Sequence, residues 1–143
     1  MLANALRKAR AVAERSGPHR HVLGVDTEVL LDARLLGKAD DEQHARAHLG
    51  ALSGRTHEVL SGVALLHDGA EATAVVRTAV AFRTLGPELV EWYLASEEWR
   101  GRAGAYAVQG RGAALVASIE GDYWNVVGLP VTALLDMAPW LLG

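Results

Sequence analysis

The spacing of apolar and polar residues predicts helices and strands in turn along the chain. Between residues 1 and 17, apolar side chains recur every three or four positions, which is typical of an amphipathic helix. Residues 21–32 begin as a continuous apolar run and alternate from Asp26 onward, which predicts a strand that is buried on both faces at its start. On that strand Thr27 should point to one face of the sheet and Asp26 to the other.

The later parts of the chain carry the same kinds of signal. We expect a turn and short return strand at 32–36, helices at 40–52, from Pro87 onward and at 130–142, strands at 55–67, 71–85 and 113–119, and a turn at 121–125. Pro139 offers an earlier end for the last of these helices. An Asp-Gly turn at 68–69 should join the two long strands into an antiparallel hairpin. Residues 97–112 are rich in glycine and lack periodicity, so we expect an irregular loop there.

Composition limits the class of protein. The 143 residues fit one domain, and 50% hydrophobic with 22% charged residues is a globular balance. A net charge of -3 provides no basic field for polymeric nucleic acid, and the lack of cysteine excludes disulfides and thiolate metal sites. The sequence has neither an apolar run of membrane-spanning length nor a secretory signal, so we expect a cytoplasmic protein.

Candidate chemistry begins at Asp26, where the predicted buried strand emerges. A carboxylate at this point, followed a dozen residues later by Lys38, suggests a phosphate or metal site, although Asp26 alone would equally suit an aspartate bonded to local amides. Lys8 borders the apolar stripe of the first helix, so its ammonium group either reaches over a neighbouring strand or extends into water. The pair His44 and His48 has metal-ligand spacing, but without a third ligand a solvated helix face is favoured.

Five short motifs occur in order along nearly the whole chain: GVDT at 24–27, LGK at 36–38, LSGRTH at 52–57, AGAYAVQG at 103–110 and GDYWNVVGLP at 121–130. Each motif is weak by itself, but their order is specific. Together they resemble the Maf family, the septum-formation-inhibitor-like nucleoside triphosphate pyrophosphatases. The last two motifs are similar to the dTTP/UTP pyrophosphatase branch rather than to the branch that acts on 7-methyl-GTP.

The resemblance implies an α/β fold of the Maf/ITPase-like kind. An elongated central mixed sheet would be flanked by helices, with a cleft between two lobes. It also implies hydrolysis of dTTP, UTP and modified pyrimidine nucleotides to the monophosphate and pyrophosphate, with a divalent metal, Mg²⁺ or Mn²⁺, as cofactor.

Individual residues receive roles from the same resemblance. Asp26 matches the catalytic proton acceptor and a metal ligand, Lys8 and Lys38 match lysines that contact the phosphates, and Thr27 and Gln109 match positions associated with base selectivity. Arg102 stands where relatives often place a lysine, so it either contacts phosphate or pairs with Glu98.

The sequence departs from the family pattern near its start. It contains no Ser-x-Ser-Pro-Arg-Arg loop and no Asp-x-Asp-Glu motif, and the usual Gly-Lys-Pro is Gly-Lys-Ala at 37–39. A native start upstream of Met1, a truncated inactive product, or a shortened protein that binds nucleotides without turnover would each explain this. The alternative function is therefore a non-catalytic nucleotide-binding or cell-division-linked protein. Because a missing strand leaves backbone N–H and C=O groups at the sheet edge unpaired, we also expect low stability or a homodimer.

Overall fold

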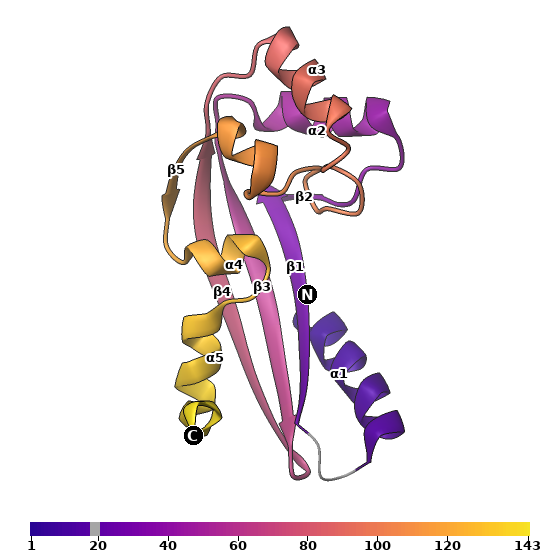
Figure 1. Cartoon of the computed structure of the whole chain (residues 1–143), viewed down its shortest axis with the longest axis vertical. Coiled ribbons are helices and arrows are strands. Elements are labelled where there is room, and N and C mark those ends of the chain that lie inside the picture. The colour runs from indigo at the N-terminus through magenta and orange to yellow at the C-terminus, as the bar shows by residue number, and fades with distance from the viewer. Residues whose placement is uncertain (18–20) are drawn as a thin grey trace.

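The computed structural model describes residues 1–17 and 21–143 and shows a long twisted sheet with helices on both faces (Figure 1). The strand order is β2-β1-β3-β4-β5, in which the strands are β1 (Val22–Leu31), β2 (Arg34–Leu36), β3 (Thr56–His67), β4 (Ala70–Phe82) and β5 (Val116–Glu120). Each pair of neighbouring strands in the described part of the chain is antiparallel, whereas the resemblance implied a mixed sheet. The predicted hairpin of the two long strands is confirmed.

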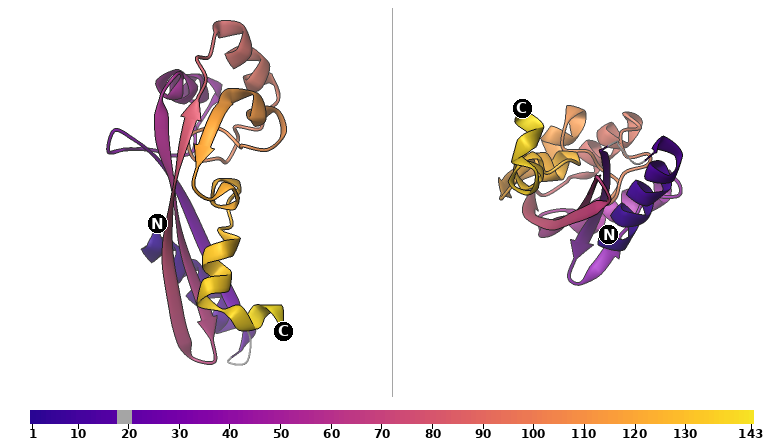
Figure 2. Two further views of the ribbon diagram at one scale, coloured as in Figure 1. Left: turned by 90° about the vertical axis from the view of Figure 1, so that its left-hand side faces the viewer. Right: turned by 90° about the horizontal axis from the view of Figure 1, so that it is seen from below.

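The helices divide between the two faces and one end of the sheet. They are α1 (Leu2–Ser16), α2 (Glu42–Leu52), α3 (Pro87–Ala95), α4 (Tyr123–Val127) and α5 (Val131–Met137), with 3₁₀ turns at Gly110–Leu115 and Pro139–Leu142. Helix α1 lies on one face, α4 and α5 lie on the other, and α2 and α3 gather at one end (Figures 1 and 2). The α/β class is confirmed. None of the described helices has the length and apolar character that crossing a bilayer requires.

Three predictions near the carboxyl terminus need correction. The predicted turn at 121–125 is wrong, because Asp122 caps α4 by accepting hydrogen bonds from the Trp124 amide at 2.8 Å and the Asn125 amide at 3.3 Å. The last strand begins only at Val116, after a 3₁₀ turn. The last helix ends as α5 at Met137 and not at residue 142, so Pro139, the earlier end that the sequence offered, limits it, and a 3₁₀ turn follows.

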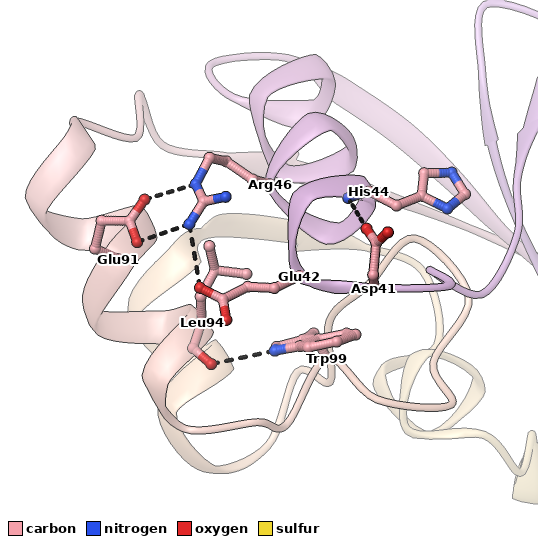
Figure 3. A network of polar contacts seen from close by, with 7 residues as sticks. All are labelled: Asp41, Glu42, His44, Arg46, Glu91, Leu94 and Trp99. Carbon is pink, nitrogen blue, oxygen red and sulfur yellow. Dashed lines mark hydrogen bonds and ion pairs between the residues drawn. The ribbon is translucent and has the colours of Figure 1, made fainter.

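An arginine fastens α2 to α3 at the end of the sheet (Figure 3). Arg46 donates from Nε to Glu91 Oε1 at 2.7 Å and from Nη2 to Glu91 Oε2 at 2.9 Å. It also donates from Nη2 to Glu42 Oε1 at 3.1 Å, an ion pair between residues four positions apart on α2. Asp41 caps α2 by accepting from the His44 amide at 2.7 Å. These contacts hold the helices that cover the larger core.

Glycines let α1 lie unusually close to the sheet. A Cβ atom at Gly24 of β1 would stand 2.1 Å from the Ala5 carbonyl oxygen, and one at Gly62 of β3 would stand 2.8 Å from the Leu2 Cα atom. Ala5 and Ala9 are fully buried against these strands. Val12, which the periodicity placed in the buried stripe, is half exposed, because α1 meets the sheet through its smallest side chains.

A methyl group at Gly24 tests this packing. We expect Gly24→Ala to lower the free energy of unfolding by at least about 1–3 kcal/mol, because the backbone of α1 must move away from β1. Gly50→Ala is the matched control: Gly50 lies in α2 with no atom within 4 Å of an added Cβ, so this change should stabilise the chain by up to about 1 kcal/mol. Urea unfolding measures both, and equal midpoints for Gly24→Ala and the parent would contradict the account.

Candidate active site

A cavity of about 480 Å³ lies where α1, β1, the end of β2 and the loop after α3 meet. It is lined by the five residues that match functional positions of the resembled family: Lys8, Asp26, Thr27, Lys38 and Gln109. The rest of the wall consists of Val29, Val59, Glu98, Gly101, Arg102, Ala103, Tyr106, Ala107, Val108, Gly110, Val126, Val127 and Gly128. Residues separated by a hundred positions in the sequence are therefore brought to one place.

Asp26 is held by two side chains of α1. Lys8 Nζ donates to Asp26 Oδ1 at 2.8 Å, and Asn4 Nδ2 donates to Oδ2 at 3.4 Å. Lys8 also donates to the backbone carbonyl oxygen of Val25 at 3.2 Å. Of the two courses that the sequence allowed for Lys8, the structure shows the one in which the ammonium group reaches over the neighbouring strand.

These contacts lower the pKa of the Asp26 carboxyl group. Burial by itself raises the pKa of its carboxyl group, but the hydrogen bonds from Lys8 and Asn4 and the positive charge of Lys8 outweigh burial and leave the pKa below its usual value. The carboxylate is therefore ionised at neutral pH, the state that a proton acceptor or a metal ligand needs.

Thr27 lies on the opposite face of β1, as the alternation predicted. Its hydroxyl group is 2.9 Å from that of Ser61 on β3. Within the described residues, β2 pairs with β1 only from Val29 to Leu31, so the outer edge of β1 beside Asp26 and Thr27 has no strand next to it. Because the cavity is lined by both residues, it extends around this edge.

The segment that follows β2 carries Lys38 into the cavity. The Gly104 amide donates to the Leu36 carbonyl oxygen at 2.8 Å, and Lys38 forms an isolated antiparallel bridge with Ala103. Lys38 and Arg102 consequently line the same cavity. The ion pairs found within residues 1–17 and 21–143 do not include an Arg102–Glu98 pair, so the pairing that the sequence left open does not form.

Two buried aromatic side chains anchor the loop that ends in Gln109. Tyr106 shares a hydrogen bond of 2.7 Å with His57 Nε2, and burial lowers the pKa of His57 to about 4, which keeps that ring neutral. Tyr93 accepts a hydrogen bond from the Ala107 amide at 3.0 Å. Both tyrosines belong to the core, so the loop is tied to a rigid base.

Asn125 places the last part of the wall. It is fully buried, and its Nδ2 donates to the Val59 carbonyl oxygen at 3.1 Å and to Thr78 Oγ1 at 3.0 Å. These bonds hold α4 against β3 and β4 and bring residues 126–128 to the cavity.

Sequence reasoning missed the roles of two polar residues of the site. Asn4 lies one helical turn before Lys8, and this spacing could have indicated that both reach the same carboxylate. Glu98 lines the cavity and accepts hydrogen bonds from the backbone amides of Arg111 and Gly112, which lie 13 and 14 residues later. The pattern of apolar and polar residues does not predict such a contact.

The donor set suits only one kind of metal site. Among the described residues no group of three His, Cys, Asp or Glu side chains could enclose an ion, and His44 with His48 gains no third ligand. The carboxylates of the cavity are Asp26 and Glu98, and Glu98 is engaged with backbone amides. Mg²⁺ commonly binds one or two carboxylates and otherwise water and substrate phosphates, so Asp26 fits as a ligand of an ion that enters with a triphosphate.

The chain is similar to known proteins over nearly its whole length. Residues 1–139 match the family model described as Maf-like protein. Proteins named dTTP/UTP pyrophosphatase are similar: that of Symbiobacterium thermophilum is 51% identical over 93% of this chain and 68% of its own length, and that of Moorella thermoacetica is 50% identical over 93% and 69%. That of Pyrococcus abyssi is 43% identical over 93% and 71%. With a match over nearly its whole length, the chain belongs to the Maf family.

Proposed function

We propose that this chain hydrolyses dTTP and UTP to the nucleoside monophosphate and pyrophosphate. The observation that carries the proposal is the ionised Asp26, held by Lys8 in a cavity that Lys38, Thr27 and Gln109 also line. The names of the similar proteins supply the substrate class, and modified pyrimidine nucleotides are further candidates. A protein of this activity works on the nucleotide pool, which is the reason to propose a cytoplasmic location.

Asp26 is the proposed proton acceptor. A water molecule that attacks the α-phosphorus must lose a proton, and an ionised carboxylate on a paired strand can orient the water and accept that proton. The bond between the α-phosphorus and the oxygen that bridges it to the β-phosphorus then breaks, and pyrophosphate leaves with that oxygen. A divalent metal ion, Mg²⁺ or Mn²⁺, would neutralise phosphate charge when bound, with Asp26 as its protein ligand.

The two lysines and Arg102 are proposed to bind the phosphates. A lysine ammonium group has three N–H donors, and Lys8 uses two of them for Asp26 and Val25. The third donor remains for a phosphate oxygen, so Lys8 would connect the substrate to the proton acceptor. Lys38 and Arg102 approach from the other wall and would share the negative charge that develops during the reaction.

Thr27 and Gln109 are proposed to select the base. The Thr27 hydroxyl and the Gln109 amide can both donate and accept hydrogen bonds, which suits the polar edge of a pyrimidine. The apolar side chains of Val29, Val59 and Val108 line the same cavity and would contact the ring.

Replacing Asp26 tests the proton acceptor. We expect Asp26→Asn to lower the rate of pyrophosphate release from dTTP with Mg²⁺ by at least about 100-fold, because an amide cannot accept the proton. Asp40→Asn is the control, since Asp40 is exposed and lies outside the cavity, and it should keep the parental rate. Release that survives in Asp26→Asn would contradict the role. A parent that releases no pyrophosphate, but whose Tm rises with dTTP, would favour the non-catalytic binding protein.

Replacing Lys8 tests whether its contact lowers the pKa of Asp26. Lys8 lowers the pKa of Asp26, so Lys8→Met should raise that pKa, and activity should be lost at a higher pH as the solution is acidified. Lys38→Met also removes a cavity lysine but leaves the Lys8–Asp26 contact, so it should lower the rate without moving this acid limb. The measurement is kcat for dTTP against pH, and coincident acid limbs for Lys8→Met and the parent would refute the assignment.

A homodimer is the last part of the proposal. It is supported by the first part of the outer edge of β1, residues 22–25, which has no strand next to it in the described residues and does not line the cavity. Leu23 in this part is 39% exposed. Light scattering should then give about twice the chain mass of 15.2 kDa, and a mass equal to one chain would count against dimerisation.

A further inference from the structure

The loop that carries Gln109 into the cavity is fastened on both sides of that residue. Two positions before it, the Ala107 amide donates to the Tyr93 hydroxyl oxygen at 3.0 Å. Two and three positions after it, the amides of Arg111 and Gly112 donate to Glu98 Oε2 at 3.1 Å and Oε1 at 3.4 Å. Gln109 is therefore held between a buried tyrosine and a carboxylate.

Glycines allow the loop to close around this carboxylate. A Cβ atom at Gly110 would stand 2.8 Å from Glu98 Oε1, and the φ angle of Gly110 is 67°, in the region that favours glycine. A Cβ atom at Gly112 would stand 1.5 Å from the Ala107 carbonyl oxygen. The backbone that follows Gln109 thus wraps directly over Glu98, and this wrapping requires both glycines.

The backbone around Glu98 is itself held by neighbouring residues. The next residue, Trp99, is almost fully buried and donates from its indole nitrogen to the Leu94 carbonyl oxygen at 3.1 Å (Figure 3). The Glu98 amide donates to Ser96 Oγ at 3.1 Å. Because hydrogen bonds to a charged carboxylate are about twice as strong as neutral ones, a firmly held Glu98 can determine where the loop lies.

We infer that Glu98 is a positioning residue for base selectivity, which acts through Gln109. This inference rests on the proposed function, because it concerns how the same cavity distinguishes nucleotides. An amide that recognises the edge of a base must be held at one place. If its donor and acceptor shift, the correct base no longer forms better hydrogen bonds than an incorrect one, and selectivity falls. Glu98 supplies that constraint on the carboxyl-terminal side of Gln109, and Tyr93 supplies it on the amino-terminal side.

The test is a double-mutant cycle on selectivity. The ratio of kcat/KM for dTTP to kcat/KM for dGTP is measured for the parent, Glu98→Ala, Gln109→Ala and the double variant. We expect Glu98→Ala to lower the ratio about 10-fold, and we expect the double variant to be no less selective than Gln109→Ala alone. Losses that add in the double variant, or an unchanged ratio in Glu98→Ala, would overturn the inference.

Two further variants separate positioning from general stability. Glu98→Gln keeps the shape and one acceptor oxygen, so it should recover part of the lost selectivity. Glu97→Ala removes the neighbouring exposed carboxylate, which pairs with Arg100 and does not line the cavity, so it should keep the parental ratio. A loss of selectivity in Glu97→Ala equal to that in Glu98→Ala would contradict a specific role for Glu98.

A structural readout keeps the inference separate from the proposed activity. If the parent releases no pyrophosphate, the ratio of the dTTP and dGTP dissociation constants replaces the kinetic ratio. If the parent binds neither nucleotide, the proposed function fails, and NMR spectra then decide the positioning role alone. The Gln109 side-chain amide signal should shift or broaden in Glu98→Ala and not in Glu97→Ala, and an unchanged signal in Glu98→Ala would overturn the inference.

Discussion

The close contact between α1 and the glycines of β1 and β3 is the constraint on which the site depends. Lys8 reaches Asp26 at 2.8 Å because α1 packs on the sheet through Ala5 and Ala9, with no side chain at Gly24 to keep it away. The same approach brings Asn4 to the second carboxylate oxygen. The packing of small residues therefore determines which side chains contact the Asp26 carboxylate, and these contacts lower its pKa.

The opposite wall of the cavity is built by a different principle. It is an irregular loop rather than a paired strand, so its precision comes from side chains that bond its backbone. Tyr93 and Glu98 hold the amides on either side of Gln109, and Tyr106 is tied to the buried His57. The paired strand offers the carboxylate, and the fastened loop offers the polar group that would read the base. This division suits an enzyme that must hold its reacting group rigidly and choose among related substrates.

Local patterns were enough to predict much of this arrangement. Alternation along β1 placed Asp26 and Thr27 on opposite faces, and the hairpin of β3 and β4 followed from its Asp-Gly turn. The family motifs identified Asp26, Thr27, Lys38 and Gln109, and these four residues line one cavity together with Lys8. Contacts between distant segments could not be predicted, because periodicity indicates only which face of an element is apolar. Glu98 and its amide partners belong to this group, as does the choice of Lys8 between solvent and Asp26. The helix α4 is a different case, because Asp122 is a standard capping residue and was visible in the sequence. Residues 121–125 were nevertheless predicted as a turn.

The most direct measurement of the central claim follows the oxygen of the attacking water. Hydrolysis of dTTP by this chain in ¹⁸O-labelled water, followed by mass spectrometry of both products, shows which phosphorus the water attacks. If Asp26 directs water to the α-phosphorus, one labelled oxygen appears in dTMP and the pyrophosphate stays unlabelled. Label in the pyrophosphate, release of orthophosphate in its place, or no turnover of dTTP would contradict the account.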